Sequence, residues 1–130
     1  MKVKRNKDKG NFLVRYVKSF KHAIDGLVYA IENEHNVLIM MIAALVTFAA
    51  SFFLKISTVE LGLVVICICT IIACEMINSA IEACVDLETI KEHPLAKIAK
   101  DCASGATLVL VFMSIFIAGI IFVPRIIDLF

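Results

Sequence analysis

The chain has 130 residues, and 61% of them are hydrophobic, compared with roughly 45–50% in soluble domains. The length limits the chain to one domain, and the composition excludes an ordinary soluble protein and indicates an integral membrane protein. The formal net charge is only +1, so overall charge names no partner, and we expect no nucleic-acid ligand.

The amino-terminal quarter is predicted to hold a charged tail and a surface helix. Eight of the thirteen Lys and Arg residues lie within the first 21 positions, and residues 1–10 are expected to be disordered. Over residues 11–33, apolar side chains such as Tyr16 and Phe20 recur at helical spacing, while Lys18 lies on the opposite face. This pattern suits a helix in the membrane surface, with its basic groups near anionic headgroups. The alternative is a soluble amphipathic helix that packs on another chain.

Three uncharged runs follow, and each predicts a transmembrane helix. The runs at 37–54 and 102–123 are close to the ~20 apolar residues that a helix needs to cross a bilayer. The run at 61–74 is too short unless its helix continues into the acidic residues that follow. The predicted spans are 36–54, 60–86 and 97–123, so residues 11–130 form one membrane domain.

The basic residues predict the orientation of these spans. Lys and Arg favour cytoplasmic loops. The amino terminus is strongly basic, and the second loop region carries Lys91, Lys97 and Lys100. We therefore expect a multi-pass protein of the plasma membrane with a cytoplasmic amino terminus and an external carboxyl terminus.

Acidic and amide side chains appear abruptly in the second predicted span. On a helix, Glu75, Asn78, Glu82 and Asp86 fall within about 80° of one another, and most of their neighbours are apolar. Ionisable groups inside a membrane are costly, so they are functional candidates by default. Carboxylates on one face repel each other unless a cation lies among them, and their oxygens suit Mg²⁺.

Two further polar clusters are expected at the same membrane face. Glu34 lies immediately before the first span, and Lys97, Lys100 and Asp101 lie within about one turn of the third helix. Carboxylates able to hold a metal, with lysines nearby, suggest phosphoryl transfer, although the chain has no P-loop or soluble-kinase motif. In the alternative interpretation, these lysines pair with the acids and only pin the second helix to the third. A proton- or cation-conducting protein and a purely structural membrane subunit are the competing classes.

The stretch EMINSAIEACVD, from Glu75 to Asp86, and the later HPLAKIAKDCASGA resemble the prokaryotic diacylglycerol kinase family. The resemblance implies an all-α membrane kinase with three transmembrane helices and an amino-terminal surface helix. It also implies a homotrimer that uses ATP and Mg²⁺ at a cytoplasmic site between neighbouring subunits. The HPLAKIAKD loop resembles the Gram-positive branch, whose members phosphorylate undecaprenol for cell-wall carrier recycling. The alternative substrate is diacylglycerol, which would give phosphatidic acid.

The resemblance also assigns roles to individual residues. Glu75 is implied to be the general base on the lipid hydroxyl, with Asn78 beside it and Asp86 in support. Glu34 and Glu82 are implied to hold the metal on the ATP phosphates. The implied ATP-binding residues are Arg15, His22, Glu34, Glu82, Lys91, Glu92, His93, Lys100 and Asp101, and the implied lipid-binding residues are Arg15, Glu75 and Asn78.

Overall fold

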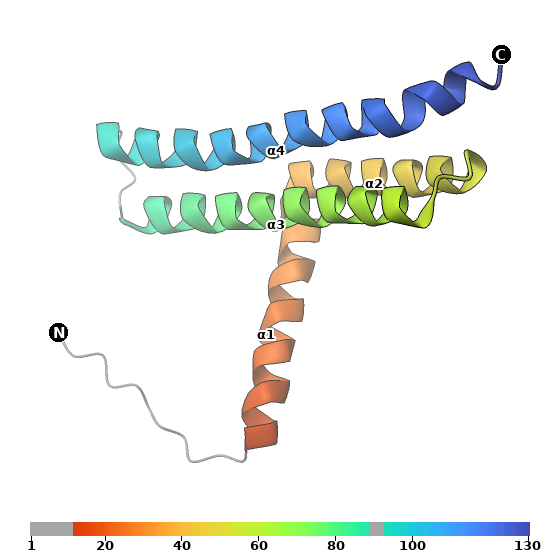
Figure 1. Cartoon of the computed structure of the whole chain (residues 1–130). Coiled ribbons are helices and arrows are strands. Elements are labelled where there is room, and N and C mark those ends of the chain that lie inside the picture. Colours follow the sequence, from red (N-terminus) through yellow and green to blue (C-terminus); the bar gives the residue numbers. More distant parts are fainter. Residues whose placement is uncertain (1–11, 89–92) are drawn as a thin grey trace.

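A computed structural model describes residues 12–88 and 93–130, and these residues form helices and no strand. Three of the helices are long and apolar enough to cross a membrane, which confirms the prediction of an all-α protein with three candidate membrane spans. In Figure 1 these three lie side by side as a bundle, and the first helix stands crosswise to them. The predicted tail at 1–10, together with Lys91 and Glu92, lies outside the described residues. The helices are α1 (Phe12–Asn33), α2 (His35–Phe53), α3 (Thr58–Glu88) and α4 (Pro94–Ile127).

Local sequence signals set the helix boundaries. Glu34 is extended (φ −104°, ψ 106°), so the chain turns between α1 and α2. At the start of α3, Ser57 and Glu60 exchange hydrogen bonds of 2.7 and 3.3 Å in a capping box. At the start of α4, the side chain of His93 accepts a hydrogen bond from the backbone of Leu95, and Pro94 occupies the first turn, where its missing N–H costs nothing.

The three bundle helices differ in length, and this difference positions the polar residues. At ~1.5 Å per residue, the 19 residues of α2 span about 28 Å, close to the thickness of a bilayer core. The 31 residues of α3 and the 34 of α4 span about 46 and 51 Å. Figure 1 shows both longer helices continuing past the point where α1 joins α2. The α3–α4 pair therefore forms a two-helix arm beyond that junction.

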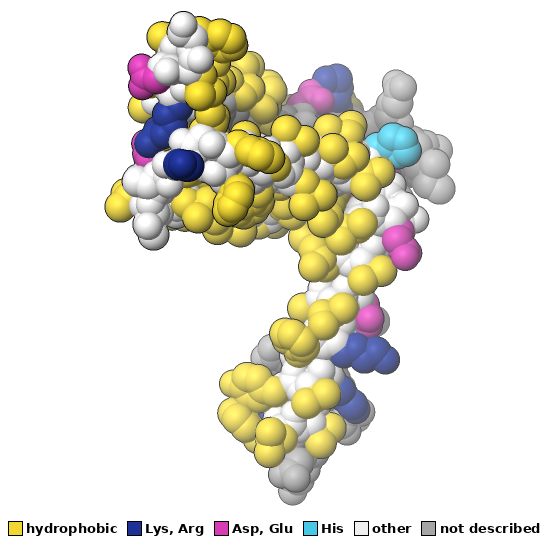
Figure 2. Space-filling view, turned by 90° about the vertical axis from the view of Figure 1, so that its right-hand side faces the viewer, with side chains coloured by type: hydrophobic (Ala, Val, Ile, Leu, Met, Phe, Trp, Pro, Cys, Tyr) yellow, Lys and Arg dark blue, Asp and Glu magenta, His cyan; other side chains and the backbone are white. Residues whose placement is uncertain are grey.

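Few side chains are buried within a single chain. Val37 is fully buried between the helices, whereas most large apolar residues are exposed, and Figure 2 shows hydrophobic side chains over much of the bundle surface. A soluble monomer rarely exposes so large an apolar surface, so lipid or other subunits must cover it. Among the residues that the structure describes, four polar ones are nevertheless buried, namely Ser51, Glu75, Asn78 and Thr107.

Candidate active site

The polar cluster begins at Glu75, near the middle of α3. Its side chain is only 3% exposed. Asn36, in the first turn of α2, donates a hydrogen bond from Nδ2 to Glu75 Oε1 at 2.7 Å. A buried carboxylate needs such a partner, because removing the group from water without one is costly. The amide orients the carboxylate but does not neutralise its charge.

Asn78, one turn further along α3, connects two helices. It is 6% exposed and lies between Glu82 and Ser104. Its Nδ2 donates to Glu82 Oε1 at 3.1 Å, and its Oδ1 accepts a hydrogen bond from Ser104 Oγ of α4 at 3.3 Å. The hydroxyl of Ser104 thereby fixes the orientation of the amide, and the amide in turn orients the Glu82 carboxylate.

Next to this cluster, residues of α1 and α3, together with Glu34 between α1 and α2, line a cavity of about 440 Å³. Glu34, Glu82 and Asp86 all line it, so three carboxyl-bearing residues from two segments of the chain face one space. Glu34 stands at the amino end of α2, where the helix dipole favours negative charge. The described residues contain no group of three side chains close enough to hold a metal alone.

The lysines near the cluster pair with aspartates. Lys100 Nζ lies 2.6 Å from Asp86 Oδ1 and joins α4 to α3, whereas Lys97 pairs with Asp101 on its own helix. Exposed pairs of this kind contribute little to stability. The interpretation of the acids as partners that pin α3 to α4 therefore fits Asp86. It does not fit Glu75, whose hydrogen bond comes from an amide.

Some predicted site residues are not brought to the cluster. Arg15 and His22 lie on α1, and Arg15 lines a separate hollow with other α1 residues. Arg15 precedes Gly26, the first α1 residue that lines the acidic cavity, by 11 residues, or about 16 Å along the helix, whereas His22 lies about one turn from Gly26. His93 caps α4. The ATP-binding roles of these residues, and of Lys91 and Glu92, stay predictions.

Two residues of the cluster were missed from the sequence. Asn36 occupies the first turn of an otherwise apolar helix, and Ser104 stands among small residues that were expected only to allow close helix packing. Asn36 carried a usable signal, because an amide facing the interior of a membrane helix needs a partner. No sequence signal distinguished Ser104 from a small residue that only allows close helix packing.

A bundle of three membrane-length helices, with a buried carboxylate and an acid-lined cavity at one helix junction, defines a small multi-pass membrane protein with a polar site. The sequence pattern described as prokaryotic diacylglycerol kinase matches residues 21–122. The chain is 38% identical to the undecaprenol kinase of Bacillus subtilis over 92% of its own length and 98% of the relative. It is 35% identical to a diacylglycerol kinase of Helicobacter pylori over 81% of the chain and 82% of that relative.

A third relative, a diacylglycerol kinase of Synechocystis, is 30% identical over 85% of this chain and 64% of its own. The chain therefore belongs to the prokaryotic diacylglycerol kinase family, as its motifs predicted. It is a membrane lipid kinase that uses ATP. The polar cluster on α3 lies within the EMINSAIEACVD stretch that resembles this family.

Proposed function

We propose that this chain transfers the γ-phosphate of ATP to the hydroxyl of undecaprenol, giving undecaprenyl phosphate for cell-wall carrier recycling. The observation that carries this proposal is the similarity to the undecaprenol kinase, which extends over nearly the whole length of both chains. Diacylglycerol is the second candidate, favoured by the family description and by the names of the other two relatives. Each lipid carries a hydroxyl at the membrane interface, so the chemistry is the same.

Glu75 is the general base in this proposal. The lipid hydroxyl oxygen attacks the γ-phosphorus, the bond from that phosphorus to the β–γ bridging oxygen breaks, and ADP leaves. The proton of the hydroxyl passes to the Glu75 carboxylate and then to water. Asn36 holds Oε1, which leaves Oε2 to receive the proton. Asn78, one turn away and also buried, holds the lipid oxygen near the base.

Glu34 and Glu82 are the proposed residues for Mg²⁺. Carboxylates from both residues line one cavity, and Mg²⁺ is commonly held by one or two carboxylates together with substrate phosphates, so the residues fit this ion. When bound, the ion would neutralise charge on the phosphates. Lys100 lies at the edge of the same cluster, where it pairs with Asp86. In this proposal, Lys100 leaves Asp86 and binds a phosphate oxygen of ATP. Asp101 is the proposed contact to the rest of the nucleotide.

The proposed site lies at the cytoplasmic boundary of the membrane. The length of α2 matches the bilayer core, and the contact of its first turn with Glu75 supports a position for the base at that boundary. The crosswise direction of α1 supports a helix in the membrane surface, as does the gathering of charged side chains on one side of α1 in Figure 2. The α3–α4 arm then reaches the cytoplasm, where ATP is available.

A homotrimer with sites shared between subunits completes the proposal. The large exposed apolar surface supports association within the membrane. The direction of α1, crosswise to the bundle, supports sharing, because Arg15 lines a hollow formed by α1 residues and could serve the cluster of a neighbouring subunit. Crosslinking in native membranes should give trimers, and monomers alone would contradict this assembly.

The direct test is a phosphorylation assay with purified protein, Mg-ATP, undecaprenol and diacylglycerol side by side. We expect transfer to undecaprenol with the higher kcat/KM. A clear preference for diacylglycerol would favour the second candidate. Folded protein that phosphorylates neither lipid would contradict the kinase proposal, and an ion flux measured in vesicles would then favour a conduit.

A further inference from the structure

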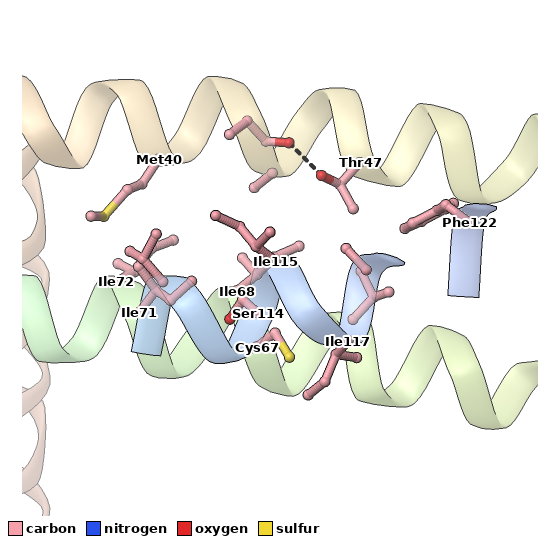
Figure 3. A pocket seen from close by; sticks show the side chains of 15 residues that line it. Met40, Thr47, Cys67, Ile68, Ile71, Ile72, Ser114, Ile115, Ile117 and Phe122 are labelled. Carbon is pink, nitrogen blue, oxygen red and sulfur yellow. Dashed lines mark hydrogen bonds between the residues drawn. The ribbon is translucent and has the colours of Figure 1, made fainter. Parts of the chain in front are cut away.

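Charged side chains are absent from the described residues that line the open groove between α2, α3 and α4. Figure 3 shows this groove lined by apolar side chains such as Met40, Ile68 and Ile115, with only hydroxyl and thiol groups among them. The charges that act on a nucleotide at the polar cluster therefore come from outside this groove. The α3–α4 arm supplies two of them, Lys100 and Asp86, which form an ion pair between the helices.

This ion pair can open at little cost. Lys100 lies in the second turn of α4 and Asp86 in the last turn of α3, with Nζ and Oδ1 2.6 Å apart. Their side chains are 35% and 63% exposed, so water or another ion can replace either partner. Lys97 and Asp101, in contrast, pair within α4, and their contact does not depend on α3. The Lys100–Asp86 pair is therefore a weak and exchangeable contact across the arm.

Asp86 also belongs to the acidic cavity. It lines this cavity together with Glu34 and Glu82, and it follows Glu82 by one helical turn, so both carboxylates lie on the same face of α3. Like charges at this spacing repel each other. Lys100 offsets one of the three negative charges, and it does so at the carboxylate closest to the end of α3.

Lys100 has two competing anionic partners once a nucleotide binds. In the proposed function Lys100 leaves Asp86 for a phosphate oxygen of ATP, and Asp86 then lies without its cation beside the other carboxylates. The aspartate stays next to the lysine throughout, because both are fixed to packed helices. ADP carries one phosphate group fewer than ATP and attracts the lysine less strongly. After transfer, the balance therefore returns toward Asp86.

We propose that Asp86 is a positioning residue that competes with the nucleotide phosphates for Lys100 and so promotes the release of ADP. In each cycle Lys100 passes from Asp86 to ATP, and from ADP back to Asp86, and no covalent bond is formed or broken in this exchange. The inference rests on the proposed function, because it takes Lys100 as a phosphate contact. It differs from a purely structural role, in which Asp86 would only join α3 to α4.

The release of ADP, measured without lipid and without turnover, tests this competition. The full-length protein in detergent is loaded with Mg²⁺ and a fluorescent methylanthraniloyl-ADP, and dissociation is followed after unlabelled ADP is added in excess. Asp86→Asn should slow dissociation and lower Kd about fivefold, since Lys100 then has no competing carboxylate. Asp86→Glu keeps the carboxylate and should restore the wild-type rate. Glu88→Gln removes the same charge from the last turn of α3, but outside the acidic cavity, and should change nothing.

Lys100→Met separates this inference from the proposed function. It should raise the Kd for the same ADP roughly tenfold. In that background Asp86→Asn should have no further effect, because the competition needs the lysine. If Lys100→Met weakens ADP binding while Asp86→Asn also weakens it or leaves it unchanged, the inference is overturned and the phosphate contact stands. A tightening by Asp86→Asn that persists without Lys100 would show simple charge repulsion and would also overturn the inference. Unchanged ADP binding in Lys100→Met would refute the phosphate contact, and the inference with it.

Discussion

Two regions of α3, its first turn and its second half, each place acidic residues against neighbouring helices, but the partners of these acids differ. Where α3 begins and α4 ends, both oxygens of Glu60 accept hydrogen bonds from Arg125, at 2.9 and 2.6 Å. Arg125 also donates to the Ile121 carbonyl, and the backbone N–H of Ser57 donates to the Glu60 carboxylate. A bidentate pair of this kind is strong and geometrically specific. The Glu60 carboxylate is therefore neutralised by Arg125 within the fold.

In the second half of α3, Glu75 and Glu82 are contacted by amides instead of cations. Asn36 and Asn78 fix the positions of the carboxylates and leave their negative charge uncompensated. Such carboxylates can still accept a proton or bind a cation, which Glu60 cannot do without losing Arg125. An acid in a membrane helix is therefore not functional by location alone, because its partner decides whether its charge is available.

Exchanging Glu75 for glutamine gives the largest expected effect. Glu75→Gln keeps the shape of the side chain but removes the proton acceptor, so kcat should fall by ~10²–10⁴-fold with ATP affinity largely intact. The control is Glu60→Gln, the same change on the same helix, which should leave kcat unchanged. Turnover and nucleotide binding are measured together. A parallel fall in both for Glu75→Gln would make it a binding or folding residue, and wild-type turnover would exclude it as the base.

Glu82→Gln probes the proposed metal contact. We expect the Mg²⁺ concentration for half-maximal activity to rise by about 100-fold, since even supporting residues of metal sites cost 10–100-fold in affinity. Glu88→Gln removes the same charge from the exposed end of α3 and should behave as wild type. The measurement is a Mg²⁺ titration of initial rates. An unchanged titration for Glu82→Gln would contradict the metal assignment.

Asn36→Ala tests whether an amide partner positions the base. Loss of a hydrogen bond to a buried charged group should lower kcat about tenfold and leave the KM for ATP unchanged. Asn33→Ala removes an exposed amide that bonds only to the Tyr29 carbonyl, and serves as the control. Partial recovery in Asn36→Gln would support a donor role. If Asn36→Ala lowers thermal stability but not kcat, the residue is only structural.

Arg125→Met, which removes the partner of Glu60 in the first turn of α3, should have the smallest effect on activity. It leaves Glu60 without its partner, so the unfolding temperature in detergent should fall while kcat and both KM values stay at wild-type levels. The double variant with Glu60→Gln should recover part of the loss. A large change in kcat would mean that the Glu60 and Glu75 regions are coupled, and would remove the contrast between a structural and a functional acid.

The sequence by itself determined the helical class, the three membrane spans, the family and the stripe of acids on one helix face. These features depend on local quantities, because the length of an apolar run and the rotation of ~100° per residue hold for any helix. Both α3 and α4 begin earlier than the predicted spans at 60 and 97. The capping box at Ser57 starts α3, and the proline at position 94 starts α4, before the apolar run of each helix.

Only the tertiary structure decided which helix faces meet. Glu75 bonds to a residue 39 positions away and Glu60 to one 65 positions away, and no local pattern distinguishes these partners from other polar residues. The direction of α1, crosswise to the other helices, could not be predicted from the sequence either. Each of these contacts depends on how whole helices pack against one another. Packing is set by the sum of many weak apolar contacts, and no single residue carries enough of that sum to be recognised in advance.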